Sequence, residues 1–422
     1  MALNHANLAN AIIWLIAAAA VFGILFRPWG LSEAVWAVAG ALLLVIGSLV
    51  SWHQAWLAVA KGTDVYLFLS GMMLLSELAR AEGLFDWVAA HAVRAARGSP
   101  KRLFGLTYLV GIGVTALLSN DATAVVLTPA VYAASRHARA EPLPYLLVCA
   151  FIANAASFLL PIANPANLVV YASHLPPLGT WLARFAMPSI GALVATFLML
   201  RATQRNALEM AFGASVLVPR LTRGAKLAAL GIALTAAVLL WASASGRQLG
   251  APTFIAGAIT ITVALALDRR KPWHLVKGVS WGVLPLVAGL FVLVAGLART
   301  GVLGEFGAAL RALATHSGHL AVFVSGGSVA AACNVMNNLP VALIAGSMGP
   351  SVAARLKDAM LIGVDLGPNL SVTGSLATIL WLVALRREKV HIGPLAFLKL
   401  GALVMPPALL LALASLTFGH PG

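Results

Sequence analysis

Two short polar clusters interrupt apolar sequence at matching places in the two halves of the chain. The first lies in TALLSNDATAVVLTP, Thr115 to Pro129, and the second in AACNVMNNLPVALIAG, Ala331 to Gly346. A shift of 218 positions aligns Gly71 with Gly289, Gly83 with Gly301 and Asn120 with Asn338. A duplicated chain that breaks the same apolar segment in each half is typical of a secondary transporter.

The composition places the chain in a membrane. Of its 422 residues, 61% are hydrophobic and only 10% are charged, whereas soluble domains carry about 25% charged residues. Leu8 to Phe26 contains no charge and is long enough to cross a bilayer, which takes about 20 residues. The start, MALNHANLAN, lacks the basic region of a cleavable signal. We therefore expect an all-α polytopic membrane protein of the cell (inner) membrane.

The net charge of +15 reflects membrane topology rather than nucleic acid binding, because the Lys and Arg residues flank apolar spans. They also suit contacts with anionic lipid headgroups. If both termini lie outside, most of these residues fall in inside loops, including a basic connector from Arg201 to Lys226. The positive-inside rule then predicts that both termini face outside.

The apolar segments predict two inverted repeats, each with about five transmembrane helices and one re-entrant hairpin. In each repeat a broken helix follows the hairpin, and an amphipathic stretch precedes it (Leu84 to Arg97, and Val302 to Ala314). The predicted boundaries are 1–200 for repeat one, 201–226 for the connector, 227–422 for repeat two, 103–135 and 320–348 for the hairpins, and 144–172 and 352–385 for the broken helices.

The arms beside each polar tip are predicted to be too short to cross a hydrocarbon core of about 30 Å. Backbone that ends inside the membrane is tolerated only within protein or against water. We therefore expect both tips to meet at a buried, hydrated site at the midplane.

The polar residues at the tips and breaks are amides, hydroxyls and two carboxylates, without Lys or Arg. This set suits a small neutral polyhydroxy solute, since amides and hydroxyls both donate and accept. It also suits a hard cation held by oxygen, and it disfavours a multiply charged oxyanion. The candidate substrate-binding residues are Asn120, Asn154, Asn164, Asn167, Asn337, Asn338, Ser371, Thr373 and Ser375.

Asp121 and Asp365 are the only acids in the breaks. A carboxylate at this depth can take up and release a proton near neutral pH, so both are candidates for proton coupling. The alternative is that they cap the N-termini of half-helices, since Asp121 directly precedes an apolar arm. A lone buried Asn often only ties two helices together, and this alternative stays open for Asn154, Asn164 and Asn167.

The sequence SNDATAVVLTP, then FIANAASFLLPIANPANL, MNNLPVAL and DLGPNLSVTGSLATILWL, resembles the ArsB-type arsenite and antimonite efflux permeases of the ion transporter superfamily. The likeness extends from Leu8 to about Leu416, and the last motif is the most specific. The tip motifs are shared more widely with sodium/proton antiporters and carboxylate transporters.

The resemblance implies export of trivalent arsenic and antimony hydroxides by proton antiport, with a soluble arsenite-stimulated ATPase as a further partner. It also implies a scaffold and a moving, elevator-like transport unit. One departure is Asn154, where the family often has Asp. The two cysteines, Cys149 and Cys333, are too few for a three-thiolate arsenic site, so the substrate would be the neutral hydroxide.

The nearest alternative function is a sodium/proton antiporter that uses the same acids. A carboxylate symporter fits less well because the breaks contain no basic residue. An intramembrane aspartyl protease fits poorly because Asp365 lies in IGVDLGP, without a GxGD motif. We therefore expect a transporter with no cofactor and no enzymatic activity.

Overall fold

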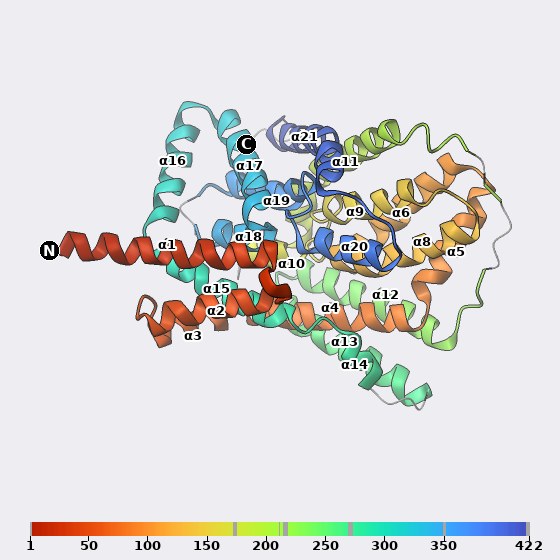
Figure 1. Cartoon of the computed structure of the whole chain (residues 1–422), viewed down its shortest axis with the longest axis horizontal. Helices are drawn as coiled ribbons and strands as arrows, with labels where there is room; N and C mark the ends of the chain where they lie inside the picture. The colour runs from red at the N-terminus through yellow and green to blue at the C-terminus, as the bar shows by residue number, and fades with distance from the viewer. Residues whose placement is uncertain are drawn as a thin grey trace.

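The computed structural model describes residues 2–171, 175–210, 212–213, 218–268, 273–348 and 352–418. These ranges contain helices and connecting turns but no strand. Figure 1 shows α1 and α16 toward the end that carries the N-terminus, and α5, α6 and α8 toward the opposite end. The all-α prediction is confirmed.

The first half contains eleven α-helices and two irregular helical segments within the described ranges. They are α1 Ala2–Phe26, η1 Pro28–Gly30, α2 Glu33–Ile46, α3 Trp52–Lys61, α4 Thr63–Ala81, α5 Leu84–Ala96, α6 Pro100–Leu117, α7 Asn120–Ala122, the π-helical η2 Thr123–Leu127, α8 Thr128–His137, α9 Leu143–Ala155, α10 Pro165–Tyr171 and α11 Leu178–Thr203.

The second half follows a closely similar order. Its described helices are α12 Arg223–Ala244, α13 Gly250–Asp268, α14 Trp273–Gly278, α15 Val283–Arg299, α16 Val302–His316, α17 Gly318–Met336, α18 Asn338–Ser347, α19 Ala354–Leu366, η4 Gly367–Asn369, α20 Leu376–Arg387 and α21 Pro394–Phe418. The short helices α3 and α14 were not predicted from the sequence.

The aligned glycines Gly83 and Gly301 occupy the same structural position in each half. Gly83 and Gly301 adopt positive φ angles of 73° and 83°, and each leads directly into the amphipathic helix of its half, α5 or α16. A side chain is strained at such angles, which explains glycine at both positions. Helices α15 and α16 meet at a bend of 70°.

Gly71 and Gly289 allow the two halves to pack closely. A Cβ on Gly71 would collide with the backbone of Thr253 in α13, and a Cβ on Gly289 would collide with the backbone of Ala37 in α2. Helix α4 therefore packs on α13, and α15 packs on α2. Each half thus supplies a glycine-bearing helix that packs against the other half.

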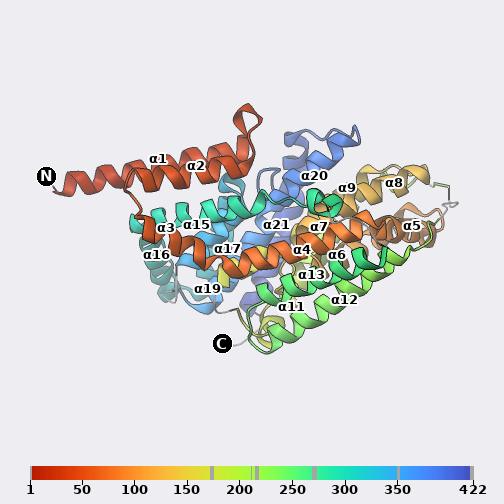
Figure 2. The same cartoon turned by 90° about the horizontal axis from the view of Figure 1, so that it is seen from below.

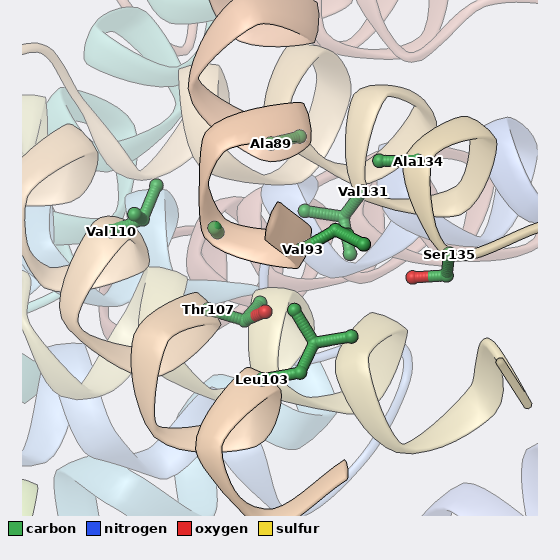
Figure 3. Close-up of a pocket in the computed structure, with 9 residues that line it drawn as sticks. Ala89, Val93, Leu103, Thr107, Val110, Val131, Ala134 and Ser135 are labelled. Carbon is green, nitrogen blue, oxygen red and sulfur yellow. The ribbon is translucent and has the colours of Figure 1, made fainter. Parts of the chain in front are cut away.

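Both arms of the first predicted hairpin pack against α5. A small cavity of about 10 Å³ lies between α5, α6 and α8. Leu103 and Thr107 of α6 and Val131 and Ser135 of α8 are among the residues that line it, and Figure 3 shows these side chains. Two residues of the connector form hydrogen bonds next to this hairpin, one just before α6 and one just after α8. The N–H of Phe212 donates to Gly98 (3.3 Å), and the N–H of Gly213 donates to Ala138 (3.1 Å).

The first arms are longer than the sequence predicted. Ser99 and Ser317 cap their N-termini through side-chain oxygens that accept from Arg102 and Leu320. Helix α6 has 18 residues and α17 has 19, so each extends about 27–29 Å at 1.5 Å per residue. Arm length alone therefore does not decide whether these segments are re-entrant.

Six helices of the described ranges are long and apolar enough to cross a membrane, and two bent helix pairs raise that number to eight. The broken helices fail such a length test because each half-helix is short. Figure 1 shows α10 and α19 toward the middle of the molecule, and Figure 2 shows α12 and α13 along one side. The chain is therefore built as a multi-pass membrane protein around a broken-helix centre.

Candidate functional site

The first tip is held by its own polar side chains. After α6, Ser119 is extended, and its Oγ accepts from the N–H of Ala122 at 3.1 Å, which caps α7. The Asn120 side chain accepts from the N–H of Asp121 at 2.9 Å. Ser119, rather than Asp121, is therefore the cap, and the capping explanation for Asp121 is wrong.

The second tip turns at Asn337, whose φ of 74° is unusual for a residue other than glycine. Its Oδ1 accepts from the N–H of Leu339 at 3.4 Å, and its Nδ2 donates to the carbonyl of Thr373 at 3.3 Å. Such strain persists where the surrounding structure fixes it, and it is common at ligand sites.

Each tip is bonded to the broken helix of its own half in the same way. The backbone N–H of Asn120 donates to the carbonyl of Ala163 at 3.1 Å. The backbone N–H of Asn338 donates to the carbonyl of Gly374 at 2.8 Å. The two residues aligned from the sequence therefore make equivalent backbone contacts, which fix each tip beside a break.

The second break has a compact network of amides and hydroxyls. Asn334 donates from Nδ2 to the carbonyls of Ala330 (2.8 Å) and Gly367 (3.0 Å), and its Oδ1 accepts from Ser371 (2.7 Å). The hydroxyls of Ser371 and Thr373 are 3.0 Å apart, and Thr373 donates to the carbonyl of Asn334. Ser371 and Thr373 thus lie together, half-buried, beside the second tip.

The two broken helices meet through buried side chains. Asn154 of α9 donates to Asn369 (3.0 Å) and Thr378 (3.3 Å), and Asn369 donates to the carbonyl of Phe151 (3.0 Å). Asn164, which precedes α10, donates to Asp365 at 2.6 Å. All five polar side chains are at most 3% exposed, so these contacts form a polar core between the halves.

Two predicted residues act mainly on their own break. The amide of Asn167 donates to the carbonyl of Ser157 at 2.8 Å, which holds the turn between α9 and α10. Ser375 caps α20 by accepting from the N–H of Thr378 at 3.1 Å. For these residues, the contacts support a structural role.

The two carboxylates differ in surroundings. Asp365 is fully buried in the last turn of α19; its Oδ1 accepts from Asn164, and its Oδ2 has no partner among the described residues. Asp121 is half-buried in the first turn of α7, and no described residue hydrogen-bonds its carboxylate. Both side chains therefore retain free oxygen atoms, as a proton carrier requires.

A large cavity of about 870 Å³ lies on one side of this region. Helices α3, α4 and α15 and the start of α13 line it on one side, while Leu168 and Val169 of α10 and Leu343 of α18 line it on the other. Its polar lining includes Lys61, Asp64 and Arg299. The cavity therefore lies between one broken helix and one tip arm on one side and the neighbouring long helices on the other, while α10 still contacts α4 and α18 still contacts α15.

The sequence did not identify Thr378 or a cluster formed by the buried Asp358 and Tyr171 with the half-buried Arg184. Tyr171 donates to Asp358, and Arg184 lies 3.4 Å from the same carboxylate. One signal was available: Asp358 precedes Asp365 by seven residues, which places both acids on one face of a helix.

A buried polar core between broken helices is typical of a membrane transporter. The chain belongs to the family described as "Citrate transporter" (CitMHS), whose family model matches residues 10–385. It is 28% identical over 416 residues to the "Arsenical pump membrane protein" of Escherichia coli, covering 93% of this chain and 95% of that relative. The protein of the same description from Yersinia enterocolitica is 29% identical, with the same coverage.

Among solved structures, the chain resembles the YdaH transporter of Alcanivorax borkumensis, with a TM-score of 0.58 and 15% identity over 87% of this chain and 88% of that one. This likeness supports the fold. The full-length relatives confirm the resemblance to arsenite permeases that was inferred from the motifs.

Proposed function

We propose that this protein exports the hydroxides of trivalent arsenic and antimony from the cytoplasm by proton antiport. The relatives named as arsenical pumps cover almost its whole length. The observation that carries the proposal is the chemistry of the tips and breaks. They offer Asn, Ser and Thr side chains, which suit a neutral molecule with three O–H groups.

The same chemistry argues against citrate, despite the description of the family. A tricarboxylate requires cationic partners, and Arg is the side chain best suited to hold carboxylates. No Lys or Arg occurs in 118–123, 156–164, 334–338 or 367–375. Buried amides alone would leave the charges of citrate without partners.

Asp121 and Asp365 are the proposed proton carriers. Export of a neutral solute against its gradient needs a coupled ion, and a carboxylate that exchanges protons supplies this link. The proposed substrate ligands are the amides and hydroxyls of Asn120, Asn337, Asn338, Ser371 and Thr373, beside the tips. Asn154 and Asn164 hold the adjacent broken helices.

The transport movement is proposed to be elevator-like. The cavity between α10 and α18 on one side and α4 and α15 on the other is where a moving unit would separate from a scaffold. The amphipathic helices α5 and α16 would connect the two parts at the membrane surface. In the proposed orientation both termini lie outside, and the connector from Arg201 to Lys226 lies in the cytoplasm.

A sodium/proton antiporter is the second candidate. The observation that favours it is three buried oxygen atoms without described partners, Asn154 Oδ1, Asn167 Oδ1 and Asp365 Oδ2, which are ligands suited to a hard cation. Such a protein would move protons in response to Na⁺ and would give no protection against arsenite.

The test is expression in an arsenic-sensitive bacterial host, with cellular arsenic measured with and without a protonophore. We expect low cellular arsenic that rises when the protonophore is added. Arsenic levels equal to those of the empty-vector control, together with Na⁺-dependent proton movement in vesicles, would instead establish the antiporter. The role of a soluble ATPase is tested by adding one to the same host.

A further inference from the structure

Helices α10 and α19 run antiparallel and are joined by two polar contacts with equal spacing. Asn164, at the start of α10, contacts Asp365, and Tyr171, at its end, contacts Asp358. From the first contact to the second, the residue number increases by seven on α10 and decreases by seven on α19, as expected for antiparallel helices. Seven residues are about two turns, or about 10 Å, so both contacts lie along one shared face.

The outer contact is a cluster of charged groups. Asp358 is 3% exposed; it accepts from the hydroxyl of Tyr171, and it lies 3.4 Å from Arg184 of α11. The ammonium of Lys357 lies 5.1 Å from the centre of the Tyr171 ring. The Arg184 side chain is 32% exposed, so the cluster extends from the buried interior to the surface of the protein.

Other charged or titratable groups near this end contact α21. Arg355 donates to the carbonyls of Leu416 and Thr417, and His319 stacks on Phe418 at 5.3 Å. Among the described residues, the charged groups beside Asp358 are therefore Arg184 and Lys357. This leaves the Asp358 carboxylate as the acidic member of the cluster.

The inner acid lacks a visible route to water. Asp365 is fully buried, and its Oδ2 has no described partner. Asn167 lies between Asn164 and Tyr171 on the same face of α10, and its Oδ1 is also buried without a described partner. Unpaired buried oxygens are sites where water molecules bind, and such waters can complete a proton path.

We propose that Asp358, with Tyr171 and Arg184, forms the outer end of a proton path to Asp365, separate from the route of the substrate. This inference rests on the proposed proton antiport. A proton from outside binds Asp358, passes through the Tyr171 hydroxyl and water beside Asn167, and protonates Asp365. Asp358 is then again a carboxylate beside Arg184. No other bond changes, and the proton is released inward when Asp365 deprotonates.

The experiment uses the full chain in proteoliposomes, with arsenite-driven proton movement followed by a pH-sensitive dye over a series of external pH values. Arsenite exchange at equal concentrations is measured in parallel, since it needs no net proton transfer. The variants are Asp358→Asn, which keeps the shape, and Tyr171→Phe, which keeps the ring. Asp86→Asn, an exposed acid on α5, is the matched control, Asp365→Asn tests the inner end of the path, and the wild-type protein tests the proposed function itself.

We expect Asp358→Asn to slow proton movement by about a hundredfold, the lower range for a positioned proton-transfer group, and to flatten its dependence on external pH. Tyr171→Phe should slow it in the same direction, while exchange stays at the wild-type rate for both. Asp86→Asn should match wild type in both assays.

The path is refuted if Asp358→Asn and Tyr171→Phe move protons at the wild-type rate while Asp365→Asn does not. If the variants lose arsenite exchange as much as they lose proton movement, the cluster has only a structural role, and the proposed path is also refuted. If Asp358→Asn does not fold, Tyr171→Phe decides alone. Wild-type coupling in Asp365→Asn would also refute this path and would leave Asp121 as the proton carrier. Arsenite-driven proton movement that is absent from the wild-type protein would count against the proposed function instead.

Discussion

The side chain of Asn164 donates a 2.6 Å hydrogen bond to Asp365, although 201 positions separate the two residues. The same Asn accepts from the N–H of Ala166 at 3.0 Å, so it also caps α10. Asp365 lies in the last turn of α19, where the helix dipole makes a negative charge unfavourable. One side chain therefore connects the two broken helices and stabilises the buried acid.

Replacing Asp365 or Asp121 with Asn should uncouple transport from protons. Asn keeps the size and hydrogen bonding of Asp but does not titrate. At whichever of the two acids carries the proton, we expect the Asn variant to lose arsenite accumulation against a gradient in inverted vesicles, while downhill exchange of arsenite persists. If both single variants and the double variant still concentrate arsenite, proton coupling through these acids is wrong.

Asn164→Ala should destabilise the protein. It removes the cap of α10 and leaves Asp365 without its donor, and each loss costs about 1–2 kcal/mol. The measurement is thermal unfolding of purified protein in detergent. Asn164→Asp retains an oxygen that can cap α10 but loses the amide that donates to Asp365. If this variant unfolds at the same temperature as wild type, the hydrogen bond to Asp365 contributes little to stability.

Alanine at Asn120 or Asn338 should reduce arsenite efflux with little change in expression. Their backbone bonds to Ala163 and Gly374 do not depend on the side chain, so the tips should keep their shape. We also predict that the two tips lie close together at mid-membrane depth. If the double variant exports arsenite at the wild-type rate, neither the Asn120 amide nor the Asn338 amide binds the substrate.

The orientation is tested with single cysteines and a membrane-impermeant thiol reagent in intact cells. Cys149 and Cys333 are buried and should not react. We expect labelling at Thr315→Cys, an exposed position in the last turn of α16, and no labelling at Arg205→Cys in the connector. The reverse pattern would place the connector outside and overturn the proposed topology.

Gly71→Ala should weaken the packing of α4 on α13. The added Cβ meets the backbone of Thr253, which cannot move as a side chain does, so we expect a loss of about 1–3 kcal/mol. Gly105→Ala on α6 is the control, because its Cβ would contact nothing within 4 Å. Equal melting temperatures for the two variants would contradict the close approach of the helices.

The sequence alone determined the membrane class, the positions of the breaks and the alignment of the two halves. These features depend on local composition and spacing. A run of apolar residues needs a bilayer, and a polar tip needs burial in protein. Gly83 and Gly301 could be matched by position because a positive φ angle favours glycine at both.

Only the tertiary structure decided which side chains meet. The pairs Asn154–Asn369, Asn164–Asp365 and Tyr171–Asp358 each join residues about 190 to 215 positions apart. No periodicity encodes such contacts, because they depend on how two short half-helices are placed against each other. A different, local reason explains why Ser119, rather than Asp121, is the cap: the backbone geometry within one turn decides which side chain accepts the free N–H.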